Sequence, residues 1–227
     1  IFPFEISEKF TGGDIRNFID DGIAKISSDG EILYKKSINQ ILIDNNYHSL
    51  IFGKGGRSAI DPIHLNDIEV APKDTQFWKK NDLFLSARDL STIIVYRPSS
   101  NKVLYMISGP LIKQHDVDII SDNTISVFNN NAMLSRMGNV IKDNSEIAIY
   151  NFETKQFSKL MNDTLKSINF ATASEGLSEI LSDNSLLLEE QNKGRILLLN
   201  SEGQIEWEYT NEDEGQVSIL NWSRVIR

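Results

Sequence analysis

Polar side chains suited to catalysis gather in one stretch of the chain, residues 61–131. This stretch holds two of the three histidines, His64 and His115. It also carries four other polar residues at the edges of short apolar runs: Asn66, Arg88, Gln114 and Asn129. Since these side chains interrupt runs that otherwise have strand character, chemistry is expected here.

This set of side chains suits a tetrahedral oxyanion. A guanidinium offers a planar fork to sulfate, phosphate or carboxylate, and an amide adds a donor. A neutral histidine can act as a nucleophile while a second histidine serves as acid or base. Because no cluster of carboxylates with metal-ligand spacing accompanies them, we expect neither a metal nor a cofactor.

Each of these residues also has an ordinary structural explanation. A single histidine most often lies at the surface, and Asn129, Asn130 and Asn131 together are typical of a turn. Arg88 is expected to form an ion pair with Asp89 or Asp116. Asp116 directly follows His115 and is expected to face the other way, which makes it a poor partner for the imidazole.

The composition limits the classes of function. The net charge of −9 and the pI of about 4.9 argue against a general nucleic-acid surface, which needs clustered Lys and Arg. They leave room for one local basic pocket. The absence of cysteine excludes disulfides, zinc thiolate sites and thiol catalysis. No apolar run is long enough to predict a membrane-spanning helix.

A unit of four short apolar runs recurs about every 45–50 residues, and its last two runs flank a polar turn. The expected strands are 63–71, 82–88, 92–96 and 103–107; then 115–121, 124–128, 146–151 and 156–160; then 176–183, 184–191, 194–201 and 203–210. The period predicts an all-β protein, a β-propeller of four-stranded antiparallel blades around a central channel.

The two ends of the chain are expected to close the ring. Residues 22–37 predict a hairpin around Ser28-Asp29-Gly30, and residues 215–227 resemble the first strand of the same blade. Residues 38–52 fit a short helix or a loop. The whole chain, residues 1–227, is then a single domain.

Three complete repeats and one composite blade are few for a propeller. We expect five or six blades, with two ways to reach that number. Either residues 1–21 and 38–60 supply further strands, or an N-terminal portion of the domain is missing from the chain.

Repeat positions predict that the polar residues converge. The first strand of each blade lines the channel, and residues two apart on a strand share a face. His64 and Asn66 form such a pair, His115 begins the next innermost strand, and Arg88 ends a second strand. All four are therefore expected at one mouth of the channel.

At these residues the sequence resembles the arylsulfotransferase family, the bacterial aryl sulfate sulfotransferases of propeller type. The resemblance spans about residues 20 to 225. Its motifs are His64-Leu-Asn66, Leu85-Ser-Ala-Arg88, Gln114-His115, the strand TISVFNN from Thr124, and the blade ending GRILLLNSEGQIEWEY from Gly194.

The resemblance implies sulfuryl transfer from a phenolic sulfate ester to a phenol, without a nucleotide donor. It makes His115 the nucleophile that forms a sulfohistidine, with His64 and Arg88 as further catalytic residues. Asn66, Gln114 and Asn129 are the expected substrate-binding residues. The implied location is periplasmic or secreted.

Some features depart from the family's pattern. Asn129 stands where the family has aspartate, the segment between Arg88 and His115 is short, and a further family histidine has no clear counterpart. The alternative is a non-catalytic propeller that binds a small anion or a partner protein in its channel. A structural or adhesive propeller is a third class.

Overall fold

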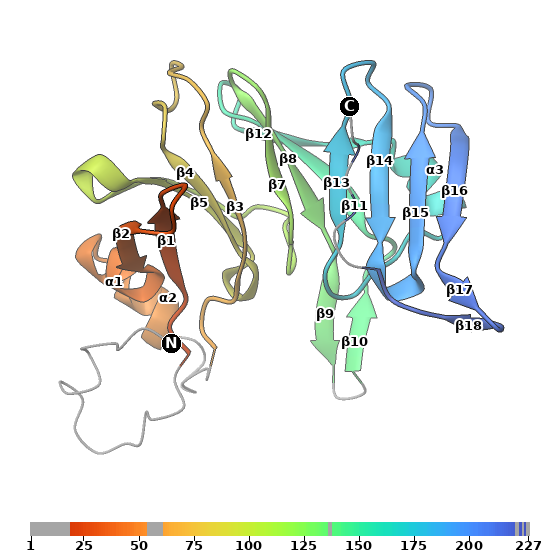
Figure 1. Ribbon diagram of the computed structural model, residues 1–227, viewed down its shortest axis with the longest axis horizontal. Helices are drawn as coiled ribbons and strands as arrows, with labels where there is room; N and C mark the ends of the chain where they lie inside the picture. Colours follow the sequence, from red (N-terminus) through yellow and green to blue (C-terminus); the bar gives the residue numbers. More distant parts are fainter. Residues whose placement is uncertain (1–18, 54–60, 136–137, 221–222, 224, 226–227) are drawn as a thin grey trace.

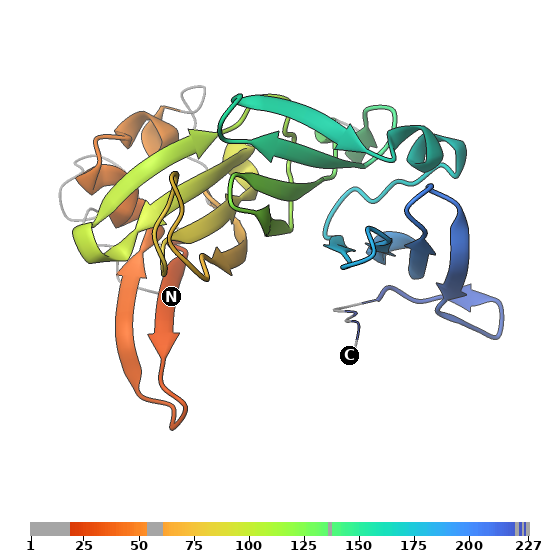
Figure 2. The same cartoon turned by 90° about the horizontal axis from the view of Figure 1, so that it is seen from above.

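Three antiparallel sheets of four strands each stand side by side along an arc (Figures 1 and 2). The computed structural model describes residues 19–53, 61–135, 138–220, 223 and 225. Each sheet is an antiparallel meander, and in sheet two a hairpin is inserted between the second and third strands. The first strands of sheets one and two contact each other, which places these strands on a common inner side.

The bounds of the sheets follow the predicted repeats. Sheet one contains β3 (Leu65–Val70), β4 (Leu83–Ala87), β5 (Thr92–Arg97) and β6 (Lys102–Ile107). Sheet two contains β7 (Val117–Ser121), β8 (Thr124–Asn129), β11 (Glu146–Asn151) and β12 (Gln156–Leu160). Sheet three contains β13 (Leu177–Ile180), β14 (Leu186–Glu190), β15 (Arg195–Leu199) and β16 (Ile205–Thr210). The all-β class is confirmed, and each of the three expected groups of four strands forms one sheet.

Smaller elements flank the sheets. The predicted N-terminal hairpin is confirmed as β1 (Gly22–Ile26) and β2 (Ile32–Ser37), and the ambiguous stretch after it forms α1 (Ile38–Asp44) and α2 (His48–Phe52). Three elements were not predicted: the hairpin β9 (Ala132–Ser135) and β10 (Gly138–Ile141), and α3 (Asn162–Ser167). The β9–β10 hairpin lies in the connection that leads from β8 to β11, the two middle strands of sheet two (Figure 1).

Apolar side chains fill the space between neighbouring sheets. Trp78 is buried between sheets one and two, where its ring centroid lies 5.2 Å from that of Phe84 and 5.1 Å from that of Phe152, both in edge-on geometry. The space between sheets two and three is filled by Phe128 and Phe170 together with Leu186, Leu188, Leu197 and Leu199 of β14 and β15. The far face of sheet one packs against α1, α2 and Ile23 of β1. Each sheet thus buries faces that it could not bury alone.

Aspartates on the inner side join each unit to the next. The carboxylate of Asp21 accepts a hydrogen bond from the N–H of Leu65 at 2.8 Å, and that of Asp67 accepts from Val117 at 3.0 Å. Asp116 accepts from Ser178 at 2.9 Å in the same way. These bonds fix where each inner strand begins relative to its neighbour, which positions the residues before β3, β7 and β13.

Two details differ from the expected strands. His64 precedes β3 and has a left-handed backbone with φ of 51°, so it does not share a strand face with Asn66. Asn66 itself lies at an irregularity, because the pairing with β4 shifts between Leu65 and Asp67. Among the residues described after β16, the strands are the two-residue β17 (Glu212–Asp213) and β18 (Gln216–Val217).

Several expectations concern residues outside the described part of the chain. They are most of residues 1–21, most of the glycine-rich stretch 53–58, and five of the last seven positions. Within the described part, no helix is long and apolar enough to cross a membrane.

Candidate functional site

A polar cavity of about 300 Å³ lies where the inner strands of the three sheets begin. We call it the mouth cavity. Its lining combines the ends of all three sheets: His64, Leu65, Asn66, Asp67, His115, Asp116, Glu175, Gly176, Leu177 and Gln191. The structure therefore brings three of the six expected site residues, His64, Asn66 and His115, into one cavity. Its volume is at the lower end of the range for small-molecule sites.

His115 has a hydrogen-bond partner on each ring nitrogen. Its Nδ1 lies 2.7 Å from Oδ1 of Asn130, and its Nε2 lies 2.8 Å from the backbone nitrogen of Glu175. A backbone N–H can only donate, so Nε2 is an acceptor and carries no proton. The proton of the neutral ring is therefore on Nδ1.

The orientation of the Asn130 amide leads independently to the same tautomer. Its Nδ2 lies 2.9 Å from the carbonyl oxygen of Thr172 and 2.6 Å from that of Glu175. Because both partners are acceptors, the nitrogen must face them and Oδ1 must face His115. Asn130 is fully buried, so this arrangement is held by the interior of the protein.

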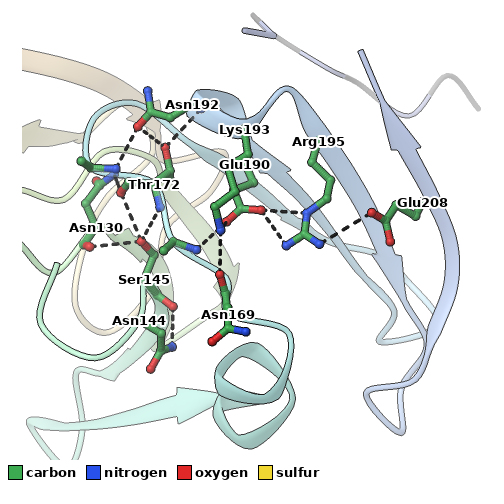
Figure 3. A network of polar contacts seen from close by, with 12 residues as sticks. Asn130, Asn144, Ser145, Asn169, Thr172, Glu190, Asn192, Lys193, Arg195 and Glu208 are labelled. Carbon is green, nitrogen blue, oxygen red and sulfur yellow. Dashed lines mark hydrogen bonds and ion pairs between the residues drawn. The ribbon is translucent and has the colours of Figure 1, made fainter. Parts of the chain in front are cut away.

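A polar network extends this support into sheet three (Figure 3). Oγ1 of Thr172 donates to Oδ1 of Asn192 at 2.6 Å. Further along, the fully buried Glu190 forms ion pairs with Lys193 at 2.9 Å and Arg195 at 2.7 Å. The residues that hold His115 are thus part of the junction between sheets two and three.

The surroundings of His115 favour its uncharged form. The pKa of His115 is lowered to about 4, chiefly by burial; the hydrogen bond to Asn130 opposes this shift, and the nearby charge of Arg88 adds to it. At neutral pH the ring is neutral and its Nε2 lone pair is available once the N–H of Glu175 moves away.

His64 has a different kind of partner. Its Nδ1 lies 2.6 Å from the carboxylate of Asp61, and its backbone N–H donates to the same carboxylate at 3.0 Å. This double contact accompanies the left-handed backbone of His64. A carboxylate that accepts from Nδ1 leaves Nε2 as the nitrogen available to a substrate, and stabilises an imidazolium electrostatically.

Asn66 and Gln114 are linked by one hydrogen bond. Nδ2 of Asn66 donates to the backbone carbonyl of Gln114 at 3.2 Å. The side chain of Gln114 is buried in sheet one, where Nε2 lies 3.2 Å from both Oγ of Ser86 and the carbonyl of Thr92. Gln114 thus contacts Asn66 through its backbone, while its side chain lies away from the mouth cavity.

Arg88 lies directly behind His64. Its backbone N–H donates to the carbonyl of His64 at 3.1 Å, and Nη1 pairs with Asp89 at 3.1 Å, one of the two expected ion pairs. Lys113 pairs with the same carboxylate at 3.2 Å. Nε of Arg88 is buried and has no hydrogen-bond partner among the described residues. The Nε–H of the guanidinium is therefore a donor without an acceptor among the described residues.

Asn129 lies away from the mouth cavity. Its Oδ1 accepts from the N–H of Ile112 at 2.8 Å, and its Nδ2 lies 3.2 Å from Oδ1 of Asn131. The side chain is fully buried. These contacts fix the loop before β7, and the adjacent Asn130, not Asn129, reaches the imidazole.

Carboxylates form the inner wall below the cavity. Burial raises the pKa values of Asp67 and Asp116, and raises that of Asp118 to about 7, with the charges of Glu69 and Asp67 adding to the effect. These groups therefore carry less negative charge than their number implies. Among the described residues, no group of three or more His, Asp or Glu side chains is arranged to hold a metal ion.

Three residues that contact the histidines were not expected from the sequence. Asp61 stands three residues before His64, and this spacing was a usable signal. Asn130 is one of three consecutive asparagines, which the sequence alone does not distinguish. Glu175 acts through its backbone and lies 60 residues from His115, so nothing in the sequence indicates the contact.

Comparison with known proteins gives one family and several similar solved structures, of which two follow. A family model described as Arylsulfotransferase (ASST) matches residues 5–212. A solved protein of unknown function from Bacteroides caccae is 12% identical and has a TM-score of 0.53; the likeness covers 83% of this chain and 59% of that one. A virginiamycin B lyase from Staphylococcus aureus is 11% identical with a TM-score of 0.41, over 86% of this chain and 64% of that one. None of the curated proteins is detectably similar in sequence.

These comparisons differ in what they establish. The chain spans less than two thirds of either solved protein. At 12% identity, the first of these structures shares the fold alone. The family model, in contrast, covers most of the chain and includes every residue of the mouth cavity. The chain belongs to the arylsulfotransferase family.

Proposed function

We propose that the protein transfers a sulfuryl group from a phenolic sulfate ester to a phenolic acceptor, with His115 as the nucleophile. One observation carries the proposal. A neutral imidazole with an unprotonated Nε2 faces a cavity of small-molecule size that a second imidazole also lines. A nitrogen nucleophile beside an acid–base group is the arrangement that covalent group transfer needs.

The transfer has two steps. In the first, Nε2 of His115 attacks sulfur, an N–S bond forms, and the bond between sulfur and the phenolic oxygen breaks. The leaving phenolate takes a proton from Nε2 of His64, whose Nδ1–H stays on Asp61. In the second, the acceptor phenol returns a proton to His64 while its oxygen attacks sulfur and the N–S bond breaks.

Two side chains are suited to hold the sulfuryl oxygens. Asn66 lines the mouth cavity with an amide. Arg88 lies outside this lining, directly behind His64, and its buried Nε–H has no partner among the described residues, so its side chain must turn toward the cavity to reach a sulfuryl oxygen. Donors fixed before the reaction stabilise charge as it develops on the transferred group. The N–H of Glu175 must leave Nε2 of His115 for the attack, and it then becomes a further donor near the sulfuryl oxygens.

The proposal is tested by incubating the protein with 4-nitrophenyl sulfate and no acceptor, then digesting it for mass spectrometry. A sulfo group on the peptide that contains His115 is expected, and adding a phenol should remove it. His115→Asn should abolish both reactions. The matched control is His48→Asn, which removes the exposed histidine of α2 and should react at the wild-type rate. Transfer by His115→Asn at the wild-type rate would disprove the assignment.

A second function, the binding of a small anion without catalysis, is supported by the hydrogen bonds of His115. Both of its ring nitrogens have hydrogen-bond partners, so neither is free to attack sulfur in this arrangement. A protein that only binds a small anion here would bind an aryl sulfate without releasing phenol. Under this alternative, Arg88→Ala weakens binding and no variant shows turnover.

For the architecture, we propose that the three sheets are blades of a propeller whose ring the N- and C-terminal strands close, with five or six blades in all. The serial links from Asp21, Asp67 and Asp116 support a repeated blade-to-blade geometry. Small-angle X-ray scattering tests it, because a compact chain of this length has a radius of gyration of about 17 Å. A clearly larger value for the monomer would indicate an open arc.

A further inference from the structure

A second cavity, larger than the mouth cavity, does not contain the histidines. It has a volume of about 540 Å³ and lies between the N-terminal hairpin and sheet one. We call it the hairpin cavity. Strand β3 connects the two sites, because residues 65–67 line the mouth cavity while Ile68 and Val70 line the hairpin cavity. The two cavities therefore lie toward opposite ends of one strand.

The walls of the hairpin cavity are mostly apolar. Ile68 and Val70 of β3 are 39% and 47% exposed, although both belong to the innermost strand of a sheet. Ile23 and Tyr34 form the opposite wall from the hairpin, and Leu83 contributes from β4. Covering these surfaces with an apolar group removes them from water, which favours binding by about 25 cal/mol per Å² of apolar area.

The charges around this apolar surface are unbalanced. Arg97 and Asp82 form a bidentate pair, with Nε to Oδ1 at 2.8 Å and Nη2 to Oδ2 at 2.6 Å, so their charges cancel. Lys25, Lys79 and Lys80 also line the cavity, and no described residue forms an ion pair with their ammonium groups. Three unpaired cations around one cavity are unusual in a chain with a net charge of −9.

We propose that the hairpin cavity binds an amphipathic organic anion, with an apolar body and a single carboxylate, sulfate or sulfonate group. The body lies against Ile68, Val70 and Tyr34, and the anionic group lies among the three lysines. Apolar walls with a few convergent polar groups are typical of small-molecule sites of this size. Either an aryl or an alkyl anion offers this chemistry. The site needs no reaction at His115.

The probe for the aryl form is naphthalene-2-sulfonate, whose carbon–sulfur bond cannot take part in sulfuryl transfer. The probe for the alkyl form is decanoate. Naphthalene-2-sulfonamide is the neutral match. Titration calorimetry gives the affinities, and backbone amide shifts in NMR locate the site. We expect the anion to bind more tightly than the neutral match and to shift Ala24, Val70 and Leu83. Whichever anion binds more tightly identifies the form of the body.

Two kinds of variant test the two halves of the proposal. Replacing Lys25, Lys79 and Lys80 by glutamine should weaken the binding of the anion. The expected loss of affinity is about two- to threefold for each lysine and about tenfold for all three together, as for exposed charge pairs. Ala24→Trp fills the cavity from an exposed position and should abolish binding. Lys142→Gln removes an exposed lysine elsewhere and should leave the affinity unchanged.

Other results would contradict the proposed binding of an anion in the hairpin cavity. Equal binding of sulfonate and sulfonamide would contradict the role of the lysines. Binding that persists in Ala24→Trp, or shifts confined to Leu65 and Asn66, would exclude the hairpin cavity. His115→Asn must bind the sulfonate as the wild type does, so failure of the transfer reaction and failure of this site are separate results.

Discussion

At the scale of single residues, the two histidines of the mouth cavity differ through their partners. His115 faces the amide of Asn130, and His64 faces the carboxylate of Asp61. An amide acceptor fixes a tautomer without adding charge, whereas a carboxylate also stabilises a proton on the ring. In the proposed transfer, His115 is therefore the nucleophile and His64 the proton donor.

The first prediction concerns the charge next to His115. Asn130→Asp places a carboxylate against Nδ1, which should raise the pKa of His115 from about 4 by one to two units. The imidazole carbon-bound protons report this titration by NMR. The acid limb of the His115 sulfation rate should move to higher pH by the same amount. Asn131→Asp adds the same charge one residue further along the turn. It should change neither the pKa of His115 nor the pH dependence of the sulfation rate. If the titration of His115 is unchanged in Asn130→Asp, then Asn130 does not position the imidazole.

The second prediction concerns proton donation by His64. Asp61→Asn keeps an acceptor for the backbone N–H but removes the charge. Transfer from esters of weakly acidic phenols should slow about tenfold or more, because their leaving group needs general acid catalysis. Transfer from 4-nitrophenyl sulfate, whose leaving group needs little help, should change less than about threefold. An equal loss for all esters would mean that Asp61 only holds the fold.

At the scale of elements, the segment before β13 decides whether His115 is accessible. Residues 173–176 carry the N–H that bonds to Nε2, and Gly176 lets them approach sheet two closely. Gly176 has a φ of +120°, and a Cβ there would lie 2.4 Å from the ring of Phe128. Only glycine fits this combination of backbone and contact.

The third prediction follows from that contact. Gly176→Ala should lower the free energy of unfolding by about 2–4 kcal/mol, through both backbone strain and overpacking. The control is Gly30→Ala, where φ is +91° and no atom lies within 4 Å of the added Cβ. Gly30→Ala therefore adds backbone strain without overpacking and should lower the free energy of unfolding by about 1 kcal/mol. Chemical denaturation measures both. Equal losses would show that the Phe128 contact is relieved without cost.

At the scale of the whole molecule, the inner strands bring carboxylates together along the arc. Asp67, Asp116 and Asp118 come from two sheets, and burial raises the pKa of each. The hydrogen bonds of Asp67 and Asp116 join the sheets, and these two carboxylates and Asp118 repel one another when ionised. The stability of the arc should therefore depend on pH.

The fourth prediction gives the sign of this dependence. The pKa of Asp118 is about 7 in the folded protein and near 3.8 in the unfolded chain. A raised acid pKa contributes stability that is complete below pH 3.8 and is lost as the pH rises through 7. Asp118→Asn should therefore raise Tm at pH 8 relative to the wild type by more than it does at pH 5.

His115 contributes with the opposite sign, because its lowered pKa gives stability that is lost as the pH falls from 6.5 toward 4. The comparison is therefore between variant and wild type at each pH. Asp122→Asn, at the exposed turn after β7, is the control and should give the same difference in Tm at both pH values. An equal gain at pH 5 and pH 8 for Asp118→Asn would contradict the assignment.

The sequence by itself determined the all-β class, the three repeats and the family. Strand alternation and turn residues are local signals, and they recur at a fixed period, so the bounds of twelve strands were found within a few residues. The family motifs around His64, Arg88 and His115 are likewise short and local. The extra hairpin β9–β10 and helix α3 were missed, because they interrupt the repeat.

Only the tertiary structure decided what each histidine contacts. Asn130 is distinguished from Asn129 and Asn131 by the path of the turn after β8, and Glu175 reaches His115 from another sheet. The hairpin cavity likewise depends on how far β1 and β2 stand from sheet one. Hydrogen-bond partners, burial and the resulting pKa shifts depend on atoms distant in sequence, so no local pattern encodes them.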